Sequence, residues 1–236
     1  MNWESVRNPR RTFSPTYKGS LSNPRDGHRS VDFESMLEED WLVRELAFDL
    51  KLRRVVSQPR VDAIAGGLPY RLDGKERIWI PDFVRQRRGR PGLQDPAPVL
   101  VEVKPLISIY PEDRDDEVRE EKRAQVREKF EVIRMAALTR GYGFELATEN
   151  EIRIQPGLDN AAFMLRTCTP LFPRSWEKIG EQAVIELPRS SSIPELQKVL
   201  PKGVDALSVA LWLAFSGQIV LDPKRKWTRA TKFARA

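Results

Sequence analysis

The sequence predicts an α/β fold, in which a mixed β-sheet is flanked by helices, followed by a small second domain. Short segments rich in Val, Ile and Leu alternate with two longer segments in which apolar residues recur at helical spacing, an order typical of a sheet covered by helices. The composition then changes at TPLFPRSW, where two prolines suggest a linker. We therefore expect a basic N-terminal arm (residues 1–30), an α/β domain (31–165) and a small C-terminal domain (170–236).

The α/β domain is expected to begin with a helix in the segment DFESMLEEDWLVRELAFDL, with Asp32 as its N-cap. RRVVSQP and VDAIA are interpreted as short strands, and ERIWIPDFV as a further strand that Pro81 interrupts. The Gly-Gly pair at 66–67 and the Asp-Gly pair at 73–74 mark turns. A polar loop, RQRRGRPGLQDPAP, then leads to the apolar strand VLVEVKP.

The charged segment 112–140 predicts an amphipathic helix that packs on the sheet, because Val126, Phe130, Ile133 and Ala137 recur at helical spacing. FELATE and EIRI predict two short strands after it. In the C-terminal domain, ELQKVL and VDALSVALWLAFSG predict two helices, and QIVLD a strand before the basic turn PKRK. This order resembles a small winged-helix unit, although other small α+β units share it.

The composition excludes several classes of function. The single Cys168 allows neither an internal disulfide nor a Cys-rich zinc site, and the single His28 excludes two-His metal motifs and most Ser-His or Cys-His triads. No apolar stretch reaches the roughly 20 residues that span a bilayer, and the N-terminus lacks the apolar core of a signal peptide. We therefore expect a globular cytoplasmic protein with no membrane partner, whose chemistry would depend on carboxylates, lysine, hydroxyls and a metal.

The charge distribution favours a polyanionic partner. The formal net charge is +6, and basic residues gather among Pro, Gly, Ser and Asn at both ends of the chain. Solvated termini are the alternative explanation, but two arms of the same sign favour nucleic acid. The residues that we expect to hold DNA phosphates are Arg7, Arg10, Arg11, Lys18, Lys224, Arg225 and Lys226.

A pattern of the form PD, spacer, (D/E)xK joins Pro81-Asp82 to Glu102-Val103-Lys104. Alternate residues of a strand point to the same side, so Glu102 and Lys104 should face one pocket while Val103 faces the core. Asp82 can join them from a neighbouring strand. Carboxylate oxygens suit Mg²⁺, which activates water and polarises a phosphate, and a lysine beside it can orient the water or stabilise the developing charge. The alternative is a surface salt bridge between Glu102 and Lys104.

A third acidic ligand is expected from the helix that precedes this pattern. Glu34, Glu38 and Glu39 are the candidates. Glu38 shares a polar sector with Glu45 and Asp49, which a solvated helix face would also show. Periodicity therefore does not choose among the three.

Short motifs in a fixed order resemble the TnsA family, the endonuclease subunits of heteromeric cut-and-paste transposons. They are FESMLEEDW, SQP, YRL, IPDFV, VEVKP, a charged helix that ends near a glycine, and FELATENEIRI, over about residues 30–155. The resemblance implies the fold of type II restriction endonucleases, within the PD-(D/E)xK superfamily. In the family, the C-terminal domain resembles a winged helix and docks on a regulator.

The resemblance also implies roles for individual residues. It selects Glu38, because the family's catalytic helix Glu precedes a Gln-Pro pair by a fixed stretch. Glu38, Asp82 and Glu102 are implied to bind Mg²⁺, for which Mn²⁺ would substitute, and Lys104 to assist the attacking water. Some members carry Gln in place of Glu102. The residues expected to have structural roles are Gln58, Thr148 and Glu149.

The resemblance implies a nuclease that cleaves the 5′, non-transferred strands of double-stranded DNA at transposon ends. Its implied partners are a TnsB-like DDE transposase, which cuts the other strands, and a TnsC-like AAA+ ATPase. Two alternatives stay open. One is a stand-alone restriction or repair nuclease of the same fold, which would cut naked DNA without partners. The other is a non-catalytic DNA-binding assembly module, against which the intact set of three acids and one lysine argues.

Overall fold

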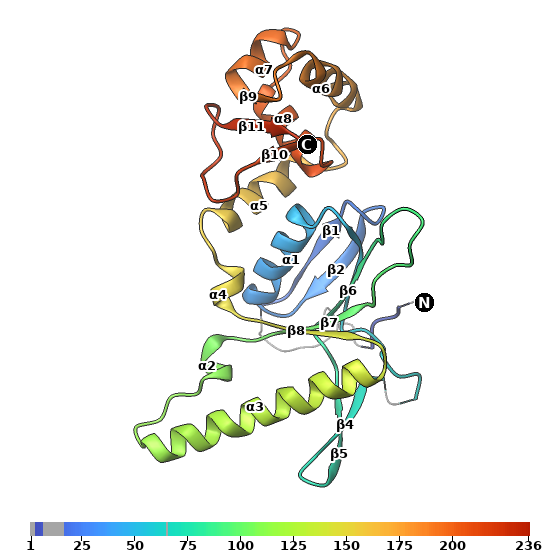
Figure 1. The fold of residues 1–236 in the computed structure, drawn as a ribbon, viewed down its shortest axis with the longest axis vertical. Coiled ribbons are helices and arrows are strands. Elements are labelled where there is room, and N and C mark those ends of the chain that lie inside the picture. Colours follow the sequence, from blue (N-terminus) through green and yellow to red (C-terminus); the bar gives the residue numbers. More distant parts are fainter. Residues whose placement is uncertain (1–2, 7–16, 65) are drawn as a thin grey trace. The chain divides into compact units, whose positions relative to one another are not determined.

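Contacts divide the chain into two units, each of which is described by itself (Figure 1). The computed structural model describes residues 3–6, 17–64 and 66–236. Unit 1 comprises Met1–Leu42 and Lys51–Ile152, and unit 2 comprises Val43–Leu50 and Arg153–Ala236. None of the helices in the described ranges combines the length and the apolar character that crossing a membrane requires.

Unit 1 is built on a four-stranded mixed sheet, as the sequence predicts. In spatial order its strands are β3 (Leu52–Ser57), β6 (Phe83–Arg87), β7 (Val99–Val103) and β8 (Gly143–Ala147). The β3–β6 and β6–β7 pairs are antiparallel, and the β7–β8 pair is parallel. A parallel neighbour requires a crossover connection, which the long helix between β7 and β8 supplies.

One face of this sheet is covered by α1 (Met36–Phe48) (Figure 1). The Trp41 ring stacks on Phe83 with a centroid distance of 4.7 Å, and Phe83 is completely buried. This stacking places the N-terminal half of α1 over the start of β6.

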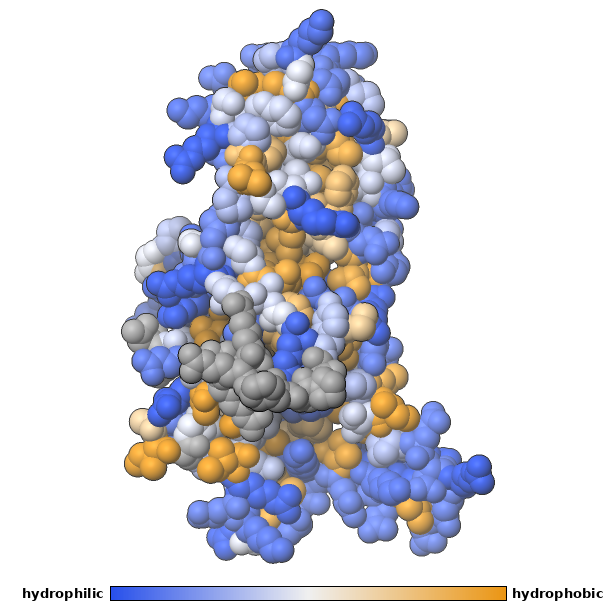
Figure 2. Space-filling model, turned by 180° about the vertical axis from the view of Figure 1, so that it is seen from behind, coloured by the Kyte–Doolittle hydropathy of each residue, from blue (hydrophilic) through white to orange (hydrophobic). Residues whose placement is uncertain are grey.

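The opposite face is covered by α3 (Asp116–Thr139) and by a hairpin of β4 (Leu68–Leu72) and β5 (Lys75–Trp79) (Figure 1). The core on this side contains Leu68, Trp79, Val84, Leu100, Ile133 and Ala137. The N-terminal part of α3 carries almost only hydrophilic residues on its surface (Figure 2). Helices on both faces of a mixed sheet confirm the predicted fold class for this unit.

The N-terminal region differs from the predicted arm. β1 (Gly19–Asn23) and β2 (Arg29–Phe33) form an antiparallel hairpin within residues expected to be extended. Asp32, which we expected to cap the first helix, lies inside β2. Residues Arg7, Arg10 and Arg11 of the predicted arm lie outside the described residues.

The first helix begins at Met36 because Ser35 and Glu38 form a capping box. The backbone N–H of Glu38 donates to Ser35 Oγ (3.1 Å). In return, Glu38 Oε2 accepts the backbone N–H of Glu34 (2.9 Å), and Glu38 Oε1 accepts the hydroxyl of Ser35 (3.1 Å). The S-x-x-E spacing is the sequence signal for this start.

A second capping box explains why the segment EIRI is not a strand. The backbone N–H and the Oγ1 of Thr148 both donate to Glu151 Oε2 (2.9 and 2.6 Å), and the helix α4 (Glu149–Ile152) follows. VDAIA is also not a strand in the described residues, where a single bridge joins Asp62 to Gly66. The structure also adds the short helix α2 (Leu106–Ile109), and residues 157–167 and 174–186 form two further helices that the sequence did not predict.

Unit 2 combines four helices with a small sheet. Its elements are α5 (Gly157–Thr167), α6 (Arg174–Glu186), β9 (Ser190–Ser192), α7 (Ile193–Val199), α8 (Ala206–Phe215), β10 (Ile219–Leu221) and β11 (Lys232–Arg235). The strands pair antiparallel in the order β10–β11–β9. The predicted helices α7 and α8 and the predicted strand β10 are present, and membership of the winged-helix class stays a prediction.

The boundary between the units differs from the predicted linker near residue 170. Ala161, Met164 and Cys168 of α5 and its end belong to the core of unit 2, and Ala47 from α1 joins them. Pro170 therefore lies inside a packed unit. Because the apolar side of α5 packs in the core of unit 2, the boundary between the units lies at residues 152–153.

Gly67→Ala is expected to destabilise unit 1 by about 1–3 kcal/mol, because a Cβ at this position would overlap the carbonyl oxygen of Trp79 and the side chains of Ile78 and Ile80. Thermal unfolding of the full chain would measure the loss. Gly157→Ala is the matched control, since its nearest atom, the oxygen of Pro223, is at an ordinary contact distance of 3.7 Å. Equal unfolding temperatures for Gly67→Ala and wild type would contradict the expected overlap.

Candidate active site

Strand pairing brings Asp82 next to the Glu102-Val103-Lys104 segment. β6 and β7 pair with Phe83 opposite Val101, so Asp82, one residue before Phe83, lies at the end of β7. The backbone N–H of Val103 donates to Asp82 Oδ2 (2.8 Å). The antiparallel register thus joins the two halves of the sequence pattern.

Glu102 and Lys104 point to the same side of β7, as their spacing predicts. Lys104 Nζ lies 3.0 Å from Glu102 Oε1 and 3.5 Å from Asp82 Oδ2. Trp79 Nε1 donates to Glu102 Oε2 (2.7 Å). Glu102 is only 5% exposed. The Glu102–Lys104 ion pair therefore exists, but the Glu102 side chain is buried and the Lys104 side chain only 35% exposed, so it is not the surface salt bridge considered as the alternative.

The structure distinguishes the three candidates for the third acid, Glu34, Glu38 and Glu39, by whether they line the cleft. Glu38 and Glu34 line the same cleft as Asp82 and Glu102. Glu39 does not line this cleft; its Oε2 accepts the hydroxyl of Tyr17 (2.5 Å). Geometry therefore leaves Glu34 and Glu38 as candidates, and Glu38 also serves as the capping residue of α1.

The cleft that these residues line has a volume of about 460 Å³. Its walls come from the N-terminus of α1, the ends of β6 and β7, the β4–β5 hairpin and α3. The complete lining consists of Glu34, Glu38, Gln58, Tyr70, Ile78, Trp79, Ile80, Asp82, Glu102, Lys104 and Lys129. Trp79 and Lys129 are members that the sequence did not predict. All four predicted catalytic residues are present in this one cleft.

The surroundings of the three acids in the cleft raise their pKa values and so favour the protonated form. Burial, and then repulsion from Asp82, raises the pKa of Glu38 to about 7 and that of Glu102 to about 7. Burial also raises the pKa of Asp82, against the opposing attraction of Lys104. Burial alone would lower the pKa of Lys104, but the attraction of Asp82 and Glu102 outweighs it and raises that pKa. The empty cleft therefore disfavours the simultaneous ionisation of all three acids.

The donor set of the cleft fits a hard divalent cation. Four carboxyl side chains and two ammonium groups line it, so its charge is negative once the acids ionise. Among the described residues no group of three or more His, Cys, Asp or Glu side chains forms a ready metal site. Lys104 contacts both Asp82 and Glu102, and the capping bonds hold Glu38. A cation bound in the cleft would replace protons and the ammonium contact on these carboxylates.

The three residues expected to have structural roles form hydrogen bonds to the backbone or at a helix start. The backbone N–H of Gln58 donates to the carbonyl oxygen of Asp82 (2.7 Å), and Gln58 holds a left-handed backbone conformation with φ 42°. Glu149 Oε2 accepts the backbone N–H of Leu106 (2.6 Å). Thr148 caps α4. The contacts of Gln58 and Glu149 hold the backbone at Asp82 and two residues after Lys104.

Of the basic residues predicted to hold DNA, the four that the structure describes do not line this cleft. Lys18 belongs to unit 1 but does not line the cleft. Lys224, Arg225 and Lys226 belong to unit 2, where Arg225 pairs with Asp222 (3.6 Å). None of these four residues is brought next to the acids by the fold of unit 1.

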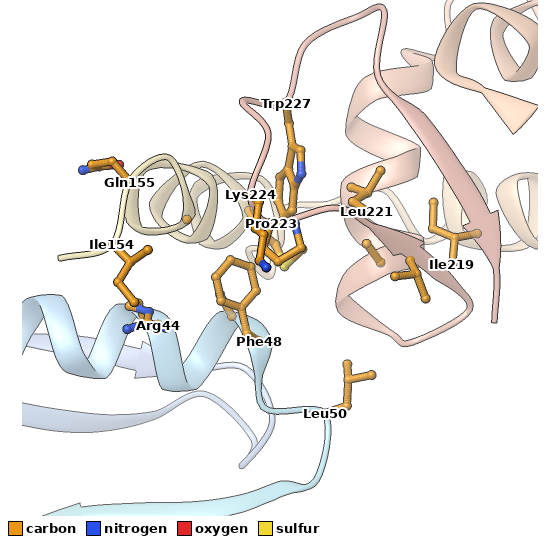
Figure 3. A pocket seen from close by; sticks show the side chains of 15 residues that line it. Arg44, Phe48, Leu50, Ile154, Gln155, Ile219, Leu221, Pro223, Lys224 and Trp227 are labelled. Carbon is orange, nitrogen blue, oxygen red and sulfur yellow. The ribbon is translucent and has the colours of Figure 1, made fainter. Parts of the chain in front are cut away.

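A second pocket, of about 430 Å³, lies within unit 2 and is mainly apolar (Figure 3). Phe48 and Trp227 meet edge to face at its side, with ring centroids 6.0 Å apart. Its charged lining residues are Arg44 and Lys224, and no acid lines it. This pocket therefore lacks the groups for hydrolysis, and the cleft of unit 1 is the candidate active site.

Comparison with known families gives one match. Residues 51–149 match the family described as TnsA-like endonuclease, N terminal. The matched segment runs from β3 to the start of α4 and includes Asp82, Glu102 and Lys104, whereas Glu38 precedes it. No curated protein matches the chain.

Glu38→Gln is expected to stabilise the metal-free protein above about pH 7, by on the order of 1–3 kcal/mol. Because the folded-state pKa of Glu38 is about 7 and its ordinary value is 4.5, the folded state binds the extra proton between these values, and stability falls as the pH rises through this window. Gln does not ionise and can still form the capping box. The gain should therefore shrink to nothing as the pH falls to about 4.5.

Chemical denaturation with a chelator present, at a series of pH values, would measure this difference. Glu39→Gln is the matched control, because Glu39 lies on the same helix and outside the cleft. If Glu38→Gln is less stable than wild type at high pH, the Glu38 carboxylate is not under electrostatic strain.

Proposed function

We propose that this protein is a Mg²⁺-dependent nuclease that hydrolyses a DNA phosphodiester bond in the cleft of unit 1, because residues 51–149 match the TnsA-like endonuclease family. The observation that carries the proposal is the buried cluster of Asp82, Glu102 and Lys104 at the ends of two paired strands. Such a cluster does not stabilise a protein, because two largely buried acids with one ammonium group cost free energy. Perturbed acids in a cleft mark a functional site.

The residues of the cleft divide the chemical work. Mg²⁺ held by Glu38, Asp82 and Glu102 would activate a water molecule and polarise the phosphate, and Mn²⁺ would substitute. Lys104 stays charged, so its ammonium can orient the attacking water or stabilise the negative charge that develops on the phosphate. Hydrolysis is direct and leaves a 5′-phosphate and a 3′-hydroxyl. Val103 N–H holds the Asp82 carboxylate in place.

We further propose that the cleaved strands are the 5′, non-transferred strands at transposon ends. A TnsB-like DDE transposase would cut the other strands, and a TnsC-like AAA+ ATPase would regulate the assembly, with unit 2 as the docking part. The cleft offers charged groups and few groups suited to reading base edges, so a partner would have to place the scissile phosphate. Positioning contributes roughly 7–11 kcal/mol to lowering a reaction barrier, so withholding it restrains the enzyme.

Asp82→Asn and Glu102→Ala are each expected to lower the rate of strand cleavage by at least about 100-fold, because each removes a charged oxygen ligand. Nicking of supercoiled plasmid in Mg²⁺ would measure the rate, and circular dichroism would show that the variants fold. Asp95→Asn is the control, since Asp95 pairs with Arg53 (2.5 Å) and does not line the cleft. Near wild-type cutting by either cleft variant would refute the site assignment.

The isolated chain is expected to cut DNA poorly and to become active with its transposase and ATPase partners. Plasmid carrying transposon ends would be incubated with the chain in Mg²⁺ and in Mn²⁺, with and without the partners, and cleavage at the ends would be mapped by strand. Cleavage of the 5′ strands should appear with the partners. Efficient cutting by the chain alone in Mg²⁺ would instead support a stand-alone nuclease.

A further inference from the structure

Lys129 is a second ammonium group in the cleft, and neither the sequence pattern nor the proposed chemistry gives it a role. It lies on α3, on the wall opposite the N-terminus of α1, and lines the same cleft as Asp82 and Glu102. The periodicity of α3 explains this placement. Lys129, Ile133 and Ala137 are each four residues apart and so follow one ridge of the helix, and the latter two are completely buried in the core.

The ridge therefore runs out of the core and over the cleft at the position of Lys129. A third apolar residue is not needed at position 129, because the neighbouring surface there is the open cleft. The ammonium group lies 5.5 Å from the ring centroid of Phe130, whose aromatic contact with Phe144 fixes it beside β8. Lys129 is thus presented to the cleft by the same spacing that presents Ile133 to the core.

Two of the six basic residues of α3, Arg127 and Lys129, have no ion pair with a described residue, and of these two only Lys129 lines the cleft. The other four form ion pairs with acids on α3 or just before it: Arg119 with Asp116, Lys122 with Asp113, Arg123 with Glu120 and Arg134 with Glu131. Lys129 forms no ion pair with a described residue. A long basic side chain that lines a cleft without a carboxylate partner is available to an anion.

The other ammonium group of the cleft is already committed. Lys104 Nζ is 3.0 Å from Glu102 and 3.5 Å from Asp82, and neutralises part of their charge. A DNA phosphate entering the cleft meets four acidic side chains and needs a cationic contact that the acids do not already occupy. Lys129 is the lining residue that meets this requirement.

We infer that Lys129 binds a phosphate of the DNA strand that lies in the cleft, and so positions the scissile bond over Asp82 and Glu102. The inference rests on the proposed function, since it takes DNA as the substrate of this cleft. It makes α3 a wall of the substrate site in addition to a support of the sheet. Lys129 is a substrate-binding residue here and takes no part in proton transfer.

The test is equilibrium binding of a short fluorescent DNA duplex to the full chain, over a range of salt concentrations in Mg²⁺. All proteins carry Asp82→Asn so that binding is measured without cleavage. Lys129→Gln is expected to weaken binding about tenfold at low salt, as a lost charged hydrogen bond would. It should also make the slope of log K against log salt less negative by about 0.9, the value for one lost phosphate contact.

Two variants control this test. Lys129→Arg keeps the positive charge and should retain the slope, and Lys122→Gln removes a lysine of the same helix that pairs with Asp113 and does not line the cleft. Each of four results would overturn the inference. Two concern Lys129→Gln and the parent: an unchanged salt slope in Lys129→Gln, or no DNA binding by the parent. The other two concern the controls: a loss of affinity in Lys129→Arg or in Lys122→Gln as large as that in Lys129→Gln. The unfolding temperature without DNA should be the same in Lys129→Gln as in the parent. If Lys129 had a purely structural role, the substitution would lower that temperature.

Cleavage by the chain with wild-type Asp82 is measured separately. Absence of cleavage with the partners present would refute the proposed function and leave the binding slope to decide the role of Lys129. Cleavage together with an unchanged slope in Lys129→Gln would refute the inference and leave the proposed function in place.

Discussion

The antiparallel pairing of β6 with β7 is the constraint on which the candidate site depends. With Phe83 opposite Val101, Asp82 reaches the backbone of Val103, and its carboxylate lies within reach of Lys104. A shift of one residue would turn the side chains of one strand to the opposite face and separate the acids. Stacking of Trp41 on Phe83, which is completely buried, holds this register from the other side of the sheet.

The clustered carboxylates of the cleft lower the stability of the empty protein and favour the binding of a cation. Glu38 and Glu102 keep pKa values of about 7 because they are buried and repelled by Asp82, so an ionised cleft destabilises the empty protein. A bound cation would relieve that repulsion. Glu38 adds a second constraint, since its carboxylate also caps α1 through the N–H of Glu34. One side chain therefore fixes the start of a helix and contributes to the cleft.

Much of the fold follows from local signals, and the errors have local causes too. Strand β7, helix α3 and helix α8 were predicted from apolar composition or helical spacing, because each buries one face or both. The start of α1 and the helix α4 were missed, although both carry the capping-box spacing: Ser35 with Glu38, and Thr148 with Glu151. β4 was not predicted; its Pro69 lies in a two-stranded hairpin, where Pro is tolerated.

The sequence by itself determined the candidate site residues: strand alternation puts Glu102 and Lys104 on one side of a strand, the PD-(D/E)xK pattern adds Asp82, and a resemblance to a family selected Glu38. Only the tertiary structure decided which other groups join them. Trp79 donates to Glu102 from a hairpin, and Lys129 lines the same cleft from α3. Their side chains become neighbours of the acids through packing across the sheet, and no spacing in the sequence encodes a contact made by that route.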